Sequence, residues 1–156
     1  MPDFILKPQS AISKIRNDFE GVNVAAKEHF AIVSISPPRA KMNSLSERVV
    51  SAFNTKLPAV GDSTTSTTPP VRILGMQQDQ FFLLFDYKGA NAVAEISEKL
   101  EDTAYLTDQS DSWVIISVSG SKARTALQQI SPVDLHSSVF RKGAIARTII
   151  NNLGTI

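Results

Sequence analysis

One segment of this chain combines a glycine turn with a lysine, a pattern that can hold an anion. Gly120-Ser121-Lys122 joins a predicted strand to a predicted helix, and a helix start favours anions. A phosphate loop, however, needs a glycine, four spacer residues and then Gly-Lys-Ser/Thr. Here Ser121 precedes Lys122, and Ala123 follows it. We therefore interpret the segment as a tight strand-to-helix turn, with a weak anion site as the alternative.

A second segment, Asp134-Leu135-His136, contains an acid and an imidazole, the types that serve as orienting group and general base. No nucleophile is marked beside them. Ser137 and Ser138 are neighbours in sequence only, and no glycine-flanked nucleophile elbow occurs in the chain. We expect His136 to hydrogen-bond loop backbone. His29, which opens a predicted strand, is expected to be structural as well.

Other charged residues are predicted to be structural. Asp108 and Asp111 flank a turn, where aspartate carboxylates commonly accept hydrogen bonds from nearby backbone N–H groups. The spaced ligands, central glycine and terminal glutamate of a calcium loop are absent. Arg39, Lys41 and Arg48 form a modest basic group near the first predicted helix. No aromatic residues interleave with it, so nucleic-acid binding is not expected.

The composition excludes several classes of protein. The chain has 156 residues, is 42% hydrophobic and 20% charged, and carries a formal net charge of +1. The chain can therefore bury a hydrophobic core, and its small net charge predicts no general attraction to nucleic acid or anionic membrane. With no cysteine and two histidines, disulfides, thiol nucleophiles and histidine-rich metal clusters are excluded. Because neither a secretory signal nor an apolar run of about 20 residues occurs, we expect a cytoplasmic protein.

The elements that must position these residues alternate between strand and helix. Proline residues end several of them, and a capping box at Ser44–Glu47 is expected to start the first helix. The polar segment 61–70 is expected to be a solvated loop, and two of the strands to form a hairpin around Asp108–Asp111. Apolar periodicity predicts strands at 29–36, 71–76, 81–87, 104–107, 113–118 and 144–150, and helices at 45–57, 92–100 and 123–130.

This order predicts an α+β fold of tandem β-α-β-β units, with helices packed on a mainly antiparallel sheet. Residues 29–156 are expected to form one domain. Residues 1–28 are expected to form an N-terminal arm, with an extended Phe4-Ile5-Leu6 and a short helical stripe of Ile12, Ile15 and Phe19. Whether the arm docks on another protein or packs on its own domain is left open.

The C-terminal part of the sequence carries a series of short motifs. They are Trp113–Val118, Ser119-Gly120-Ser121-Lys122-Ala123-Arg124 with Leu127, Asp134-Leu135-His136 with Phe140, Gly143-Ala144 and Arg147-Thr148. With these motifs, about residues 105–150 resemble the gamma subunit of heterotetrameric sarcosine oxidase, and the earlier β-α-β-β portion agrees with that family in element order only. Ser137 departs from the family, because a proline usually follows Asp-Leu-His, and the family continues with a strand and a helix that this chain is expected to lack.

The resemblance implies a fold similar to the folate-binding domain of aminomethyltransferases. It also implies a non-catalytic structural subunit of a complex that oxidatively demethylates sarcosine, in association with alpha, beta and delta subunits. FAD, FMN, NAD and tetrahydrofolate are then expected on the partner subunits, and no cofactor in this chain. Consistent with this, the residues mark no catalytic, cofactor-binding or metal-binding side chain.

Two alternatives are kept. One is a small folate-binding or aminomethyltransferase-like enzyme, which would need an acid to reach the pterin and an aromatic ring to stack on it. Asp108, Tyr105 and Asp134 are the candidates, and nothing in the sequence ranks them. The other is a regulatory ligand-binding module, suggested only by the tandem β-α-β-β units.

Overall fold

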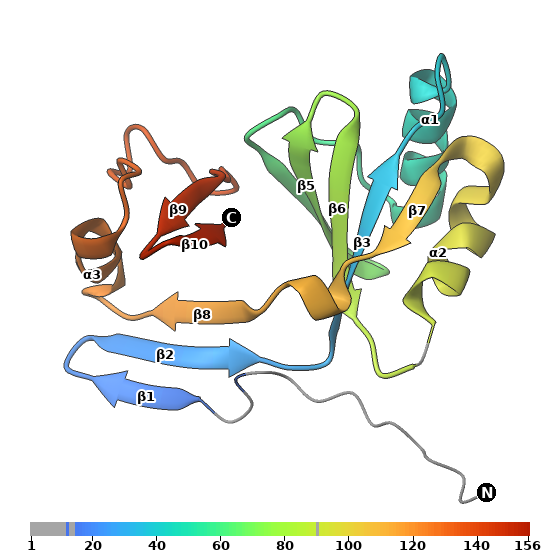
Figure 1. Ribbon diagram of the computed structural model, residues 1–156. Helices are drawn as coiled ribbons and strands as arrows, with labels where there is room; N and C mark the ends of the chain where they lie inside the picture. Colours follow the sequence, from blue (N-terminus) through green and yellow to red (C-terminus); the bar gives the residue numbers. More distant parts are fainter. Residues whose placement is uncertain (1–11, 13–14, 90) are drawn as a thin grey trace, which may run out of the picture.

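The computed structural model describes residues 12, 15–89 and 91–156, and all the strand pairings in this part of the chain are antiparallel (Figure 1). The strands form a five-stranded sheet, a three-stranded sheet and a two-stranded sheet. Helices accompany the two larger sheets. The predicted α+β class with a mainly antiparallel sheet is therefore confirmed.

The five-stranded sheet has the order β4-β5-β6-β3-β7. Its central strand β6 is apolar on both faces, as expected of a strand covered on each side. Two-residue connections join β4 to β5 and β5 to β6, so these three strands form a meander. The strands are β3 (Phe30–Ser36), β4 (Ser63–Thr67), β5 (Pro70–Gln77), β6 (Gln80–Asp86) and β7 (Tyr105–Asp108).

Two helices, α1 (Met42–Phe53) and α2 (Ala92–Leu100), cover one face of this sheet (Figure 1). Both helices have one apolar stripe, which supplies their buried residues. Phe53 and Leu100 are fully buried there, against alternate residues of β3 such as Val33. A short 3-10 helix, η1 (Glu101–Thr103), connects α2 to β7. This layer is the main hydrophobic core of the protein.

The opposite face of the five-stranded sheet carries a smaller apolar cluster. Ile32, Leu74, Met76 and Phe82 are buried in it. The partly buried residues around them are Leu84 of β6 and four residues from the C-terminal part of the chain: Trp113, which meets the Phe82 ring edge-on at 5.9 Å, together with Ile115, Ile145 and Ile156. The aromatic residues Phe81, Phe82 and Phe85 are buried in the core, whereas Trp113 is only partly buried.

The three-stranded sheet has the order β1-β2-β8, and α3 (Ala123–Ile130) follows β8 (Figure 1). Its strands are β1 (Arg16–Phe19), β2 (Val22–Lys27) and β8 (Ile115–Ser119), while β9 (Thr148–Ile150) and β10 (Leu153–Thr155) form the two-stranded sheet. A second 3-10 helix, η2 (Ser110–Ser112), lies between β7 and β8.

The N-terminal region differs from the predicted arm. Residues 16–27 form the β1–β2 hairpin, which pairs with β8 over Val24 and its neighbours. Phe19 lies in β1, so the predicted helical stripe is wrong: residues 15–19 alternate between the two faces of a strand. The predicted Phe4-Ile5-Leu6 segment lies outside the described residues.

Three further local predictions are wrong. The segment 61–70 contains strand β4, because its threonines are β-branched and pair with β5. Helix α1 begins at Met42, ahead of the predicted capping box, and its N-cap residue Lys41 makes no side-chain cap. β7 and β8 form no hairpin with each other, because β7 pairs with β3 and β8 pairs with β2.

Candidate functional site

The glycine turn before α3 is a structural junction. Gly120 has φ +111°, and a Cβ there would lie 2.4 Å from the carbonyl oxygen of Gly21. The backbone N–H of Lys122 donates to that same oxygen at 2.8 Å, and Lys122 Nζ lies 2.9 Å from Glu20 Oε1. Both donors of Lys122 are therefore engaged by the β1–β2 turn. The interpretation as a tight strand-to-helix turn is confirmed.

The loop that contains Asp134 and His136 is exposed and does not arrange a general base. Asp134 Oδ1 accepts from the backbone N–H of His136 at 2.9 Å and makes no contact with the imidazole ring. His136 Nδ1 lies 2.7 Å from Ser138 Oγ and 3.4 Å from the backbone nitrogen of Ser138. The sequence interpretation missed this serine contact, which the i to i+2 spacing can produce in a turn.

Backbone contacts fix the same loop. Phe140 N–H donates to the carbonyl oxygen of His136 at 2.8 Å, and the Arg124 guanidinium donates to the carbonyl of Leu135. An orienting acid would have to bond the imidazole, and Asp134 is instead used by the backbone. The predicted bonding of His136 to loop backbone is confirmed. The arrangement can shape a turn and gives the serine no activated base.

Asp108 also serves the fold. Its Oδ1 accepts from Ser110 N–H at 2.9 Å and from Ser110 Oγ at 2.6 Å. Ser110 Oγ in turn accepts from the Ile32 N–H at 3.1 Å, which links η2 to β3. The predicted turn role of Asp108 is confirmed. Within the described residues, no group of three or more acidic or histidine side chains could hold a metal ion.

The structure does not bring the three candidates for a folate site together. Tyr105 and Asp108 both lie on β7, and Tyr105 is 70% exposed at the outer edge of the five-stranded sheet. Asp134 lies in the loop after α3, at the other end of the molecule (Figure 1). Asp134 therefore cannot share a pterin with Tyr105, and Tyr105 and Asp108 lie three residues apart on one strand, so their side chains point to opposite faces of the sheet.

Two of the three basic residues near α1 form ion pairs with acids of η1. Lys41 Nζ lies 2.5 Å from Asp102 Oδ2, and Arg48 forms an ion pair with Glu101. The hydrogen bond and positive charge of Lys41 lower the pKa of the Asp102 carboxyl below its usual value. This arrangement fastens α1 to the end of α2 and neutralises the charges of Lys41 and Arg48.

Two pockets in the described part of the chain are small. One, of about 120 Å³, is lined by Gly61, Gly75, Met76 and Ile145 among others. Another, of about 110 Å³, lies beside Phe53, Val71 and Ile96. Sites for drug-sized ligands and cofactors usually have about 300–1,000 Å³. Neither pocket has room for a flavin or a pterin.

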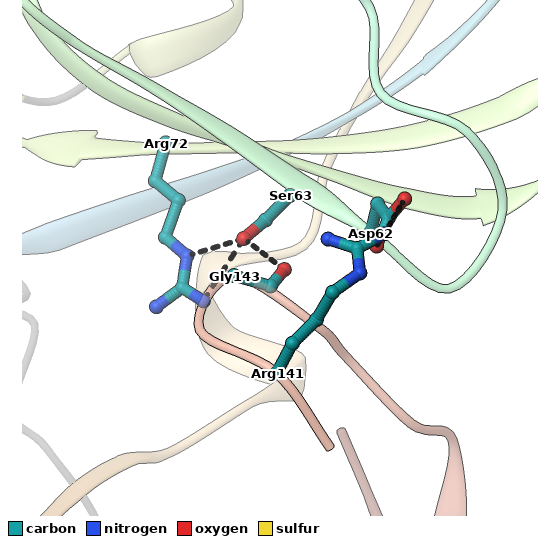
Figure 2. Close-up of polar contacts among 5 residues, drawn as sticks. All are labelled: Asp62, Ser63, Arg72, Arg141 and Gly143. Atoms are coloured by element: carbon teal, nitrogen blue, oxygen red, sulfur yellow. Dashed lines mark hydrogen bonds and ion pairs between the residues drawn. The ribbon is translucent and has the colours of Figure 1, made fainter. Parts of the chain in front are cut away.

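A polar junction that the sequence did not indicate joins the C-terminal segment to β4 (Figure 2). Arg141 Nη2 lies 2.6 Å from Asp62 Oδ1 and 2.7 Å from Oδ2. Ser63 donates to the carbonyl of Gly143 through both its N–H and its Oγ, each at 2.8 Å. Arg72 donates to Ser63 Oγ at 3.1 Å. Since the partners are about 80 residues apart in sequence, only the fold reveals them.

These contacts define an antiparallel α+β protein in which the polar residues described above bond turns, loops and neighbouring elements to one another. No known protein family matches the sequence, and no curated protein matches it significantly. Among solved structures, the chain is similar to one in heterotetrameric sarcosine oxidase from Corynebacterium sp. U-96 in complex with pyrrole 2-carboxylate. The TM-score is 0.69 at 19% identity, over 85% of this chain and 67% of the other. The likeness establishes a shared fold.

Proposed function

We propose that this chain is a non-catalytic structural subunit of a sarcosine-oxidase-like complex, equivalent to the gamma subunit. The observation that carries the proposal is the shared fold, which extends over 85% of the chain. It agrees with the resemblance of residues 105–150 to the gamma subunit. The flavins, NAD and tetrahydrofolate, and the oxidative demethylation of sarcosine, then belong to the alpha and beta subunits, and a delta subunit completes the complex. The complex is proposed to work in the cytoplasm.

The distribution of burial supports a role in assembly. Among the described residues, every buried hydrophobic side chain lies between Ala31 and Leu100. Helix α3 is amphipathic, yet Ile130 on it is 60% exposed, and Leu153 on β10 is 71% exposed. Of the twelve large apolar side chains that are exposed among the described residues, ten lie outside residues 31–100. Clusters of exposed apolar side chains are typical of surfaces that another chain covers. We propose that the large alpha subunit is that chain. No helix in the described part of the protein is long and apolar enough to span a membrane.

Co-expression tests this proposal directly. The tagged chain should co-purify with alpha, beta and delta subunits of a sarcosine oxidase from which the native gamma subunit is omitted. Ile130→Asp should abolish co-purification, because it puts a charge on the proposed surface. Lys88→Asp, a change on an exposed loop of the other half, is the control. Recovery of only the tagged chain, under conditions in which the native gamma subunit assembles, would rule the proposal out.

Calorimetry with tetrahydrofolate separates this function from the folate-enzyme alternative. The isolated chain is expected to show no binding, since the two pockets described above are small and none of the candidate pterin residues lines either of them. Micromolar binding would instead support the enzyme. In that case Tyr105→Ala and Asp134→Asn would show which end of the molecule carries the site.

A further inference from the structure

The outer edge of β1 is open. β1 is the terminal strand of the β1-β2-β8 sheet, and its register with β2 places Arg16 opposite Ala25 and Phe19 opposite Val22. No strand in the described part of the chain pairs with its other side. An unpaired strand edge is a template for another strand. What can pair there depends on which backbone groups face outward.

The backbone groups of Arg16 and Asp18 face outward. Ala26 N–H donates to the carbonyl of Ile15 at 2.9 Å, so the backbone of Ile15 faces β2. Because backbone direction alternates along an antiparallel strand, Asn17 and Phe19 also face β2. The N–H and C=O groups of the two residues between them therefore point away from the sheet. These four groups are available to an added strand.

We propose that β1 pairs with β1 of a second copy of this chain, antiparallel and centred on Asn17. In this register, Arg16 lies opposite Asp18 of the second copy, and Asp18 lies opposite Arg16 of the second copy. These are the two positions whose backbone groups face outward, so each pair exchanges two backbone hydrogen bonds. The same register places opposite charges side by side at both pairs. The proposal is independent of the proposed function.

The chemistry of residues 15–19 is what selects a second copy as the occupant. Read from either end, the strand is apolar, charged, Asn17, oppositely charged, apolar. Centring the pairing on Arg16 or on Asp18 would place like charges opposite each other, which is unfavourable. A shift of the second copy by one residue would place the outward-facing backbone groups of one β1 strand opposite residues of the other whose backbone groups face β2. Charges usually protect an edge by repulsion, but here they are complementary to those of a second copy.

The apolar side chains are arranged in the same way. Ile15 and Phe19 are 40% and 63% exposed, and both lie on the sheet face that also carries Ile116, which is 54% exposed. In the proposed register, Ile15 lies opposite Phe19 of the second copy. This is a non-hydrogen-bonded pair, in which side chains come closest, and an aromatic ring pairs well with a β-branched side chain there. The two sheets join into one of six strands, whose face carries these apolar side chains on both sides of the central Asn17 pair.

A charge-exchange experiment on the isolated full-length chain tests the register. Sedimentation velocity over a concentration series should show a monomer–dimer equilibrium for the unmodified chain. Arg16→Asp and Asp18→Arg should each weaken dimerisation about tenfold or more, because each places like charges opposite each other twice per dimer. A mixture of the two variants should form a heterodimer, since both pairs are then complementary. The double variant R16D/D18R should dimerise like the unmodified chain.

The controls carry the same charge changes elsewhere. Lys88→Asp and Asp79→Arg, both at exposed positions outside the β1-β2-β8 sheet, should leave the equilibrium unchanged. Because the chain contains no cysteine, Asn17→Cys should form a disulfide across the two-fold axis, where the Cα atoms of a non-hydrogen-bonded pair are about 4.5 Å apart. Arg16→Cys, whose side chain faces residue 18 of the second copy, should cross-link far more slowly.

Several results would overturn the proposal. One is an unmodified chain that stays monomeric up to millimolar concentration. Another is a dimer that neither charge variant weakens, which would place the interface elsewhere. Dimerisation that occurs only after residues 2–11 are deleted would show that this segment, and not a second copy, covers the outer edge of β1. Failure of the mixed variants to associate, while both retain the circular dichroism of the unmodified chain, would exclude this register.

Discussion

Arg141 and Asp62 connect the C-terminal segment to the five-stranded sheet. A single guanidinium nitrogen of Arg141 lies 2.6 Å and 2.7 Å from the two carboxylate oxygens of Asp62. Around this pair, the backbone of Ile145 donates to Gly61 at 2.9 Å, and Ala144 forms a β-bridge with Asp62. A segment with few buried side chains is thus held mainly by polar contacts.

The first prediction concerns this ion pair. Arg141→Met should destabilise the protein by only about 0.5–1 kcal/mol, because Arg141 is largely exposed and solvent screens the pair. Its larger effect should be local. Hydrogen exchange of the Ile145 N–H should accelerate clearly more than that of amides in β6. Lys142→Met, next to it and also exposed, is the control and should change neither quantity.

Much of the local structure could be predicted from the sequence, because it depends on local patterns. The apolar spacing in residues 92–100 and 123–130 gave α2 and α3 with the observed bounds. Strand alternation in residues 30–36 is equally local, and Val33 and Ile32 lie in clusters on opposite faces of β3. In each case neighbours in sequence determine which side chains share a face.

Strand partners could not be predicted in the same way. The closeness of β7 and β8 in sequence favoured a hairpin, yet β7 pairs with β3 and β8 with β2. Pairing between distant segments depends on the packing of whole layers, and no local pattern encodes it. The Asp62–Arg141 junction has the same origin, as its residues are 79 positions apart. The resemblance at residues 105–150 indicated the fold more specifically than any strand pattern.

The second prediction concerns the turn before α3. Gly120→Ala should destabilise this region by about 2 kcal/mol or more, because φ is +111° and the new Cβ would lie 2.4 Å from the Gly21 carbonyl oxygen. Exchange of the Lys122 N–H, which donates to that oxygen, reports the loss. Gly154→Ala is the control, since no atom lies within 4 Å of its Cβ position. Equal effects of the two substitutions would contradict this account of the turn.

The third prediction concerns where stability resides. Phe53→Ala should cost about 3–5 kcal/mol in urea unfolding, because the ring is fully buried between α1 and the sheet. Ile130→Ala should cost less than about 1 kcal/mol in the isolated chain, because Ile130 is 60% exposed. Native-state hydrogen exchange should then show high protection in β3, β5 and β6 and lower protection in β1, β9 and β10. Uniform protection across the chain would contradict the inference that stability is concentrated in the five-stranded sheet and its two helices.

The fourth prediction concerns the pH dependence of the Lys41–Asp102 pair. The hydrogen bond and charge of Lys41 lower the pKa of Asp102 from its usual value of 3.8. A carboxyl whose pKa is lower in the folded state stabilises that state above its unfolded pKa, and this contribution is lost as the pH falls through the folded value. Lys41→Met should therefore move the NMR-titrated pKa of Asp102 upward towards 3.8 and make stability less dependent on pH below about 4. Lys88→Met removes a lysine that makes no ion pair among the described residues, so it should leave the Asp102 titration unchanged. An unshifted Asp102 in the unmodified protein would show that the ion pair does not persist in solution.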